Sequence, residues 1–237
     1  MNRFPLVLLH HSGGTARVFD SLVKALPPEI EPIPLELPGR GRRWREEPLG
    51  SATDAVEDLL AQLPDATGDF AIFGHSMGAY LGLALAARLE NPPGQARCTT
   101  LFASGNAGPA HAAPLFTGSP LDADDETVLA VNARFGGLDP RIAGHPQLRG
   151  RAAALLRTDS AICDSFVTDL RRTVTESPIV VCCGTEDVFT PAQLAKWRLS
   201  STSVTETITY PGGHFYLDAC AAELASMISA RVGVAVG

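Results

Sequence analysis

Residues 70–78 read Phe70-Ala71-Ile72-Phe73-Gly74-His75-Ser76-Met77-Gly78, and this stretch decides the fold. Its first four residues form a continuous apolar run, which is typical of a buried parallel strand, and a helical pattern begins at Met77. A serine placed between two glycines, at a tight turn from strand to helix, presents its hydroxyl at the edge of a sheet. The N-terminus of the following helix favours negative charge that develops beside Ser76. The stretch therefore predicts a strand, a turn with a nucleophilic serine, and a helix.

The same alternation of strand and helix patterns runs along the chain and predicts a mostly parallel sheet with helices on both faces. Between about residues 107 and 176 only helical patterns remain, so we expect a helical insertion that forms a lid over the carboxyl ends of the strands. The expected strands are Leu6–Leu9, Ile30–Leu35, Phe70–Phe73, Thr100–Ala103, Ile179–Cys183 and Val204–Tyr210. The expected helices are Arg17–Leu26, Ala52–Leu63, Met77–Leu89, Asp122–Phe135, Gln147–Leu156, Ser160–Val174, Ala192–Leu199 and Leu217–Val232.

Length and composition describe one globular domain over residues 1–237, with 45% hydrophobic and 19% charged residues. The formal net charge of −7 argues against nucleic acid as the main partner, because binding to phosphates needs a basic surface. No apolar run approaches the roughly 18 residues of a membrane span, so we expect no membrane partner. The five cysteines lack the spacing of a disulfide framework or a zinc site, which predicts reduced thiols, a cytoplasmic protein and no metal.

A serine nucleophile needs a histidine base and a carboxylate that orients the histidine. His214 lies in the glycine-rich turn Pro211-Gly212-Gly213-His214-Phe215, after the last expected strand. Asp187 follows the expected strand Ile179–Cys183, at a carboxyl end, with Glu186 as the nearest competitor for the same role. The chain order Ser76, Asp187, His214 is that of the α/β-hydrolase triad, so the sequence predicts the α/β-hydrolase fold.

A tetrahedral oxyanion needs two hydrogen-bond donors. The first expected donor is the backbone amide of Met77, the residue after the nucleophile. The second comes from the glycine-rich loop after the first strand, His10-His11-Ser12-Gly13-Gly14. We assign it to the amide of Ser12, with the amide of His11 as the alternative.

Four segments together resemble the type II thioesterases of polyketide and nonribosomal peptide biosynthesis, and the similarity runs from about Leu6 to Leu217. The resemblance implies an α/β-hydrolase that removes stalled or misprimed acyl groups from the phosphopantetheine arm of acyl or peptidyl carrier proteins. It also implies a Ser76, Asp187, His214 triad, an oxyanion hole from the amides of Ser12 and Met77, no cofactor, and a monomer. The segments are His11-Ser12-Gly13-Gly14, Leu37-Pro38-Gly39-Arg40-Gly41, Phe73-Gly74-His75-Ser76-Met77-Gly78-Ala79 and Pro211-Gly212-Gly213-His214-Phe215.

The first loop departs from that family, whose members often carry an aromatic-Pro-x-Ala-Gly-Gly sequence where this chain has His10, His11 and Ser12. A backbone donor survives such a change, whereas acyl selectivity need not. Two other functions stay open. The triad also suits a general carboxylesterase or lipase-like hydrolase, and the fold could serve as a non-catalytic binding module. Nucleotide binding is disfavoured, because the chain lacks G-x-G-x-x-G spacing and a Walker pattern.

A basic run in this acidic protein contains Arg42 and Arg43, flanked by further arginines. Arginine suits phosphate recognition, so we expect these two residues to meet the carrier's phosphopantetheine phosphate or an acidic carrier surface. The alternative is a solvated loop that Glu46 and Glu47 neutralise locally.

The expected lid helices carry arginines together with Asp159, Asp164 and Asp169, which predicts a mixed, solvated face. The same segment holds apolar residues that could line an acyl chamber or form ordinary lid core. These residues are Phe116, Phe135, Leu155, Leu156 and Phe166.

Overall fold

The computed structural model describes residues 3–63, 68–90, 96–136, 142 and 144–234. In these residues a sheet of six parallel strands has the order β2-β1-β3-β4-β5-β6. All six expected strands are confirmed: four are longer than expected by one to five residues, one matches its expected range, and one is shorter by one residue. The strands are β1 (Phe4–Leu9), β2 (Ile30–Leu35), β3 (Gly68–His75), β4 (Ala96–Ser104), β5 (Ile179–Gly184) and β6 (Thr205–Tyr210).

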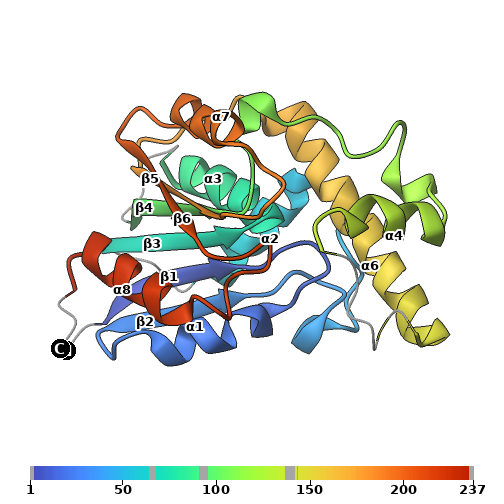
Figure 1. Cartoon of the computed structure of the whole chain (residues 1–237), viewed down its shortest axis with the longest axis horizontal. Helices are drawn as coiled ribbons and strands as arrows, with labels where there is room; N and C mark the ends of the chain where they lie inside the picture. The colour runs from blue at the N-terminus through green and yellow to red at the C-terminus, as the bar shows by residue number, and fades with distance from the viewer. Residues whose placement is uncertain (1–2, 64–67, 91–95, 137–141, 143, 235–237) are drawn as a thin grey trace.

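Helices cover both faces of the sheet, as the alternation of patterns predicts (Figure 1). Side chains alternate along β1, so that Leu6 and Leu8 join one core cluster while Val7 and Leu9 join the other. Helices α1 and α8 pack against each other on one face, and α2 and α3 cover the other. The helices are α1 (Asp20–Ala25), α2 (Ala52–Gln62), α3 (Met77–Glu90), α4 (Asp125–Ala133), α6 (Pro146–Ser165), α7 (Pro191–Leu194) and α8 (Ala221–Arg231).

The segment between β4 and β5 is helical, and its main elements α4 and α6 lie beside the sheet at the end toward which the strands point (Figure 1). One expectation here was wrong. The predicted helices Gln147–Leu156 and Ser160–Val174 are one helix, α6, which continues into the π-helical turn η5 (Phe166–Leu170). The polar residues at 157–159 do not interrupt α6, because Asp159 is fully buried and bonded to groups outside the helix.

The order of the strands places the loops that follow β1 and β3 next to each other. From β1 the chain continues to β2 on one side, and from β3 it continues to β4 on the other side. The chain therefore leaves the neighbouring strands β1 and β3 in opposite directions across the sheet. Such a switch point opens a crevice at the carboxyl ends of the strands, where ligands bind in open α/β sheets. The loop after β1 carries Ser12, and the turn after β3 carries Ser76. In the part of the chain that the structure describes, no helix is long and apolar enough to cross a membrane.

Candidate active site

The turn between β3 and α3 holds Ser76 in a conformation that few residues other than glycine adopt, with φ of 55°. The glycines on either side permit the turn by their lack of a side chain. A Cβ at Gly74 would lie 2.1 Å from the carbonyl oxygen of Gly78, and a Cβ at Gly78 would lie 2.1 Å from the carbonyl oxygen of Leu9. Strand, turn and helix therefore pack backbone against backbone, and the strain at Ser76 is imposed by its surroundings.

The structure brings Ser76, His214 and Asp187 together in one line of hydrogen bonds. His214 Nε2 lies 3.1 Å from Ser76 Oγ, and His214 Nδ1 lies 3.0 Å and 3.2 Å from the two carboxylate oxygens of Asp187. With the proton on Nδ1, the imidazole donates to the carboxylate and accepts from the serine hydroxyl through Nε2. The side chains of His214 and Asp187 are 3% and 0% exposed, so the bond between the imidazole and the carboxylate is shielded from water.

Asp187 occupies the turn directly after β5, and it accepts two further hydrogen bonds there. The amide of Val188 donates to Oδ1 at 2.6 Å, and the thiol of Cys183 lies 3.5 Å from Oδ2. Burial raises the pKa of Cys183 to about 12, so its thiol keeps its proton. These donors fix the carboxylate that faces His214, whereas the competitor Glu186 makes no bond to the histidine among the described residues.

Asn106, just after β4, holds the serine turn, and the sequence analysis missed it. Its side-chain amide donates to the carbonyl oxygen of Ser76 at 3.1 Å, while its side-chain oxygen accepts from the amide of Ala107 at 2.9 Å. The available signal was a polar residue three positions after the expected strand Thr100–Ala103, since residues just past the carboxyl end of a strand reach the functional edge of the sheet.

The loop after β1 carries two neutral histidines. Burial is the main cause that lowers the pKa of His10 to about 4, and burial also lowers the pKa of His11. The ring nitrogen Nδ1 of His10 bonds the carbonyl oxygen of His11 at 2.9 Å, and Nδ1 of His11 bonds the carbonyl oxygen of Ser12 at 2.8 Å. The two rings therefore donate to the backbone of their own loop and stiffen the segment that contains Ser12.

His75, next to Ser76, points away from the Ser76 hydroxyl and is fully buried. Its Nδ1 lies 2.8 Å from the hydroxyl of Ser104, which in turn lies 2.8 Å from the hydroxyl of Tyr216. Burial lowers the pKa of His75 well below its ordinary value, so the ring that packs 5.1 Å from the ring of His214 is uncharged.

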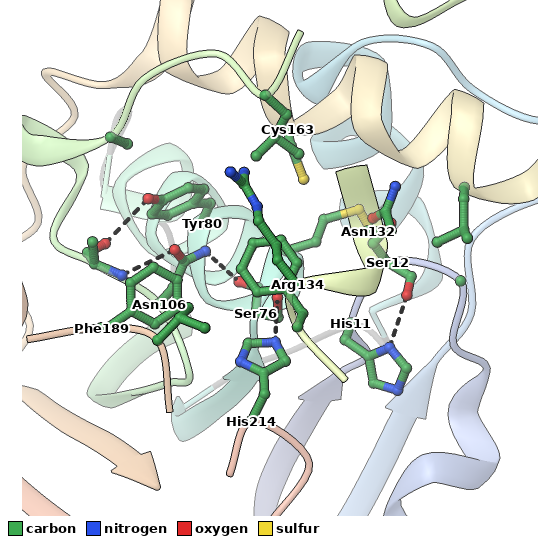
Figure 2. Close-up of a pocket in the computed structure, with 18 of the residues that line it drawn as sticks. His11, Ser12, Ser76, Tyr80, Asn106, Asn132, Arg134, Cys163, Phe189 and His214 are labelled. Carbon is green, nitrogen blue, oxygen red and sulfur yellow. Dashed lines mark hydrogen bonds between the residues drawn. The ribbon is translucent and has the colours of Figure 1, made fainter. Parts of the chain in front are cut away.

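Ser76 and His214 open into a cavity of about 580 Å³, which Ser12 and Met77 also line (Figure 2). Of the apolar candidates in the helical segment, Phe135 and Leu156 line it. Phe116, Leu155 and Phe166 do not, and Phe166 instead stacks on Tyr80 at 4.6 Å in the core. Lining residues that the sequence did not predict include Tyr80, Asn106, His111, Leu129, Asn132, Arg134, Cys163, Asp164, Phe189 and Gln193.

Two arginines of the basic run, Arg40 and Arg43, are committed to internal ion pairs. Arg43 forms ion pairs with Asp58 and Glu46 and is 22% exposed, which supports local neutralisation for this residue. Arg42 is exposed, and neither Arg42 nor Arg43 lines the cavity. Arg40 is buried and forms a two-pronged ion pair with Asp159 at 2.7 Å on both prongs.

The prediction that the aspartates of the lid helices lie on a solvated face was wrong for two of the three. Asp159 is 0% exposed and pairs with Arg40, and Asp164 is 8% exposed and accepts from the amides of Leu115 and Phe116. Only Asp169 is exposed. Both buried carboxylates tie α6 to loops outside it. No group of three or more His, Cys, Asp or Glu side chains in the described ranges is arranged to hold a metal ion.

Comparison with known proteins agrees with this geometry. The thioesterase domain family matches residues 4–232. The chain is 30% identical to the thioesterase PikA5 of Streptomyces venezuelae over 216 residues, which cover 90% of this chain and 75% of that protein. Among solved structures, the RedJ thioesterase from the prodiginine pathway of Streptomyces coelicolor is 27% identical with a TM-score of 0.82, and the match covers 97% of this chain and 91% of RedJ.

A second solved structure, the type II thioesterase BorB from the borrelidin biosynthetic cluster, is 25% identical with a TM-score of 0.82. That match covers 97% of this chain and 93% of BorB. The similarity therefore spans the sheet, the helical segment between β4 and β5, and the loops that carry Ser76, Asp187 and His214. The predicted α/β-hydrolase fold is confirmed, and the chain belongs to the thioesterase domain family.

Proposed function

We propose that this thioesterase hydrolyses acyl groups from the phosphopantetheine arm of acyl or peptidyl carrier proteins, and thereby clears stalled or misprimed synthases of polyketide and nonribosomal peptide biosynthesis. The observation that carries the proposal is the line of hydrogen bonds from Ser76 through His214 to Asp187, at the base of a cavity of about 580 Å³. The names of RedJ, from the prodiginine biosynthetic pathway, and BorB, from the borrelidin biosynthetic cluster, support the choice of substrate.

In the first step, Ser76 Oγ attacks the carbonyl carbon of the thioester while His214 Nε2 takes the hydroxyl proton. The carbon–sulfur bond then breaks, His214 returns the proton to the departing thiol, and the acyl group stays on Ser76 as an ester. Asp187 holds the imidazole in the tautomer that this transfer needs and stabilises the imidazolium. Its burial and its bond of 3.0 Å to Nδ1 suit that role.

The backbone amides of Ser12 and Met77 would bind the oxyanion of the tetrahedral intermediate. Both residues line the cavity together with Ser76. Among the hydrogen bonds of the described residues, neither amide donates to another protein group, so both are available to a ligand. Each such donor contributes roughly 10²- to 10³-fold to the rate.

In the second step, His214 removes a proton from water, which attacks the acyl ester, and Ser76 leaves with the proton that His214 returns. Because a thiolate is a good leaving group, selection of the acyl group is the harder task for this enzyme. The helical segment at about residues 107–176 would act as the lid that shapes the cavity. Leu129 of α4 and Leu156 of α6 line the cavity from this segment.

The carrier protein would dock beside the basic run. Arg42 is exposed and suits a phosphate or an acidic carrier surface, whereas Arg43 is already paired with Asp58 and Glu46. A monomer fits hydrolysis of a carrier-bound group. The five cysteines are free thiols, which fits a cytoplasmic enzyme.

The test compares hydrolysis of an acetyl group on a phosphopantetheinylated carrier protein with that of an acetyl-pantetheine thioester and an acetyl oxygen ester. We expect a preference for the carrier-bound thioester and a loss of roughly 10³-fold or more in Ser76→Ala. Arg42→Glu should raise KM for the carrier-bound substrate and leave the small thioester unchanged. Equal or faster cleavage of the oxygen ester would instead identify a general carboxylesterase.

A further inference from the structure

We propose that Asp159 and Arg40 are positioning residues for the oxyanion hole, through which helix α6 holds the loop after β1 in its catalytic geometry. The inference rests on the proposed function, because it assigns a task to the oxyanion donor at Ser12. Asp159 lies in α6, and Arg40 lies in the segment Leu37-Pro38-Gly39-Arg40-Gly41. Neither residue lines the cavity.

One carboxylate links three separate parts of the chain. Asp159 Oδ2 accepts from the amide of Gly13 at 2.7 Å and from Arg40 Nη1 at 2.7 Å, while Oδ1 accepts from Arg40 Nη2 at 2.7 Å. The side chains of Arg40 and Asp159 are 1% and 0% exposed. A charged group buried to this degree is costly unless its partners hold a defined geometry, so the carboxylate has little freedom to move.

The same helix also packs directly on Gly13. Gly13 has φ of +73°, and a Cβ on it would lie 2.8 Å from Cδ2 of Leu156. Leu156 and Asp159 are three residues apart in α6 and therefore lie on one face of the helix. Leu156 limits how closely the loop backbone can approach α6, and Asp159 accepts a hydrogen bond from the amide of Gly13.

These contacts hold both polar atoms of the peptide unit between Ser12 and Gly13. The amide nitrogen of Gly13 donates to Asp159, and the carbonyl oxygen of Ser12 accepts from Nδ1 of His11 at 2.8 Å. A peptide unit is planar, so bonds at its N–H and C=O set its orientation. The amide of Ser12 is one residue away and is therefore aimed by the same restraint. Oxyanion donors act only within a narrow range of distance, so loss of the restraint should lower the rate of the chemical step.

Arg40 acts through Asp159. Its two-pronged contact fixes the orientation of the carboxylate and neutralises the charge that would otherwise be buried alone. This contact explains why the loop carries an arginine that points inward while its neighbour Arg42 is exposed.

Two double variants separate the hydrogen bond to Gly13 from the ion pair. R40M/D159N and R40M/D159L both remove the two buried charges, and replacement of a buried pair in this way is often neutral for stability. Only the asparagine keeps an oxygen that can accept from the Gly13 amide. We expect R40M/D159L to lose roughly 10- to 100-fold in kcat with little change in KM, and R40M/D159N to recover most of that loss.

A transition-state readout excludes a merely structural effect. A trifluoromethyl ketone analogue of the acyl group forms an oxyanion on Ser76, so its affinity should fall in R40M/D159L by a factor similar to that of kcat. The concentration of active enzyme in each preparation is determined by titration of the reactive serine with a fluorophosphonate. As a matched control, Ser165→Ala removes a bond of 2.7 Å from α6 to the amide of Ala52 and should leave kcat unchanged.

His11→Phe provides an independent variant that does not touch the buried pair. The phenyl ring keeps the packing against Phe215 and His75 but cannot donate to the carbonyl oxygen of Ser12. We expect a fall in kcat and in trifluoromethyl ketone affinity with little change in KM, even if R40M/D159L fails to fold.

Equal losses in the two double variants, or unchanged kcat in His11→Phe, would overturn the proposal. The assays are run on both a thioester and an oxygen ester, since both pass through an oxyanion. If the wild type cleaves only the oxygen ester, the proposed substrate is wrong. The comparison of the variants on that ester still decides the role of Asp159 and Arg40.

Discussion

His10 should make this protein unstable in mild acid. The ring is 3% exposed, and its Nδ1 bonds the carbonyl oxygen of His11 at 2.9 Å. Burial, followed by the nearby charge of Arg40, lowers the pKa of His10 from 6.5 to about 4. The unfolded chain therefore binds a proton at a higher pH than the folded chain does, and stability falls as the pH drops from 6.5 toward 4.

The size of the effect follows from the two pKa values. The full shift corresponds to roughly 3 kcal/mol, and integration of the linkage relation assigns about 2 kcal/mol of it to the interval from about pH 7.5 to about pH 5. His10→Asn keeps a donor near the position of Nδ1 but does not titrate. We expect the wild type to lose about 2 kcal/mol more unfolding free energy than His10→Asn over that interval.

The assay is urea denaturation of both proteins, monitored by circular dichroism, at several pH values within that interval. Only the difference in pH dependence is compared, so a constant offset from the substitution does not matter. Other buried groups, such as His75, contribute equally to both proteins and cancel. Parallel curves of stability against pH would refute the reasoning, because they would show that His10 does not stay neutral in the folded protein.

Asp187→Asn should keep the fold but lower kcat by roughly 10³- to 10⁴-fold, because the asparagine amide can donate to Nδ1 of His214, which favours the wrong tautomer, and carries no charge to stabilise the imidazolium; steady-state kinetics and a thermal melt check both parts. Gly78→Ala should abolish activity and destabilise the protein by roughly 3 kcal/mol or more, since the added Cβ would lie 2.1 Å from the carbonyl oxygen of Leu9. A variant that melts like the wild type would contradict this expectation. Leu129→Trp should raise KM for long acyl thioesters and spare acetyl, because Leu129 lines the cavity; a uniform change across chain lengths would argue against an acyl-binding role.

Local patterns predicted the sheet and the serine turn well, for a physical reason. Buried parallel strands are continuous apolar runs, so each could be found without knowledge of its neighbours. The turn at Ser76 needs glycine at positions 74 and 78, because a Cβ at either position would collide with a neighbouring backbone carbonyl. The two glycines that flank the serine are visible in the sequence itself. His214 and Asp187 became candidates because each follows an expected strand, and the structure places both in hydrogen-bond line with Ser76.

Contacts between distant residues account for what the sequence analysis missed. Arg40 and Asp159 are 119 residues apart, and no periodicity indicates that one arginine of the basic run is buried against a helix of the insertion. The expected break between Leu156 and Ser160 in α6 has the same physical origin, because the burial of Asp159 against Arg40 cannot be seen in the local sequence.

The central claim is that Ser76 carries the acyl group during thioester hydrolysis, and intact-protein mass spectrometry tests it most directly. The wild type and Ser76→Ala are mixed with an acyl-pantetheine thioester, quenched in acid within the first turnover, and then digested for peptide mapping. The account predicts a mass increase of one acyl group on the wild type, located on the peptide that contains Ser76, and none on the variant. An acyl group on another residue, or thioester cleavage by Ser76→Ala at the wild-type rate, would contradict it.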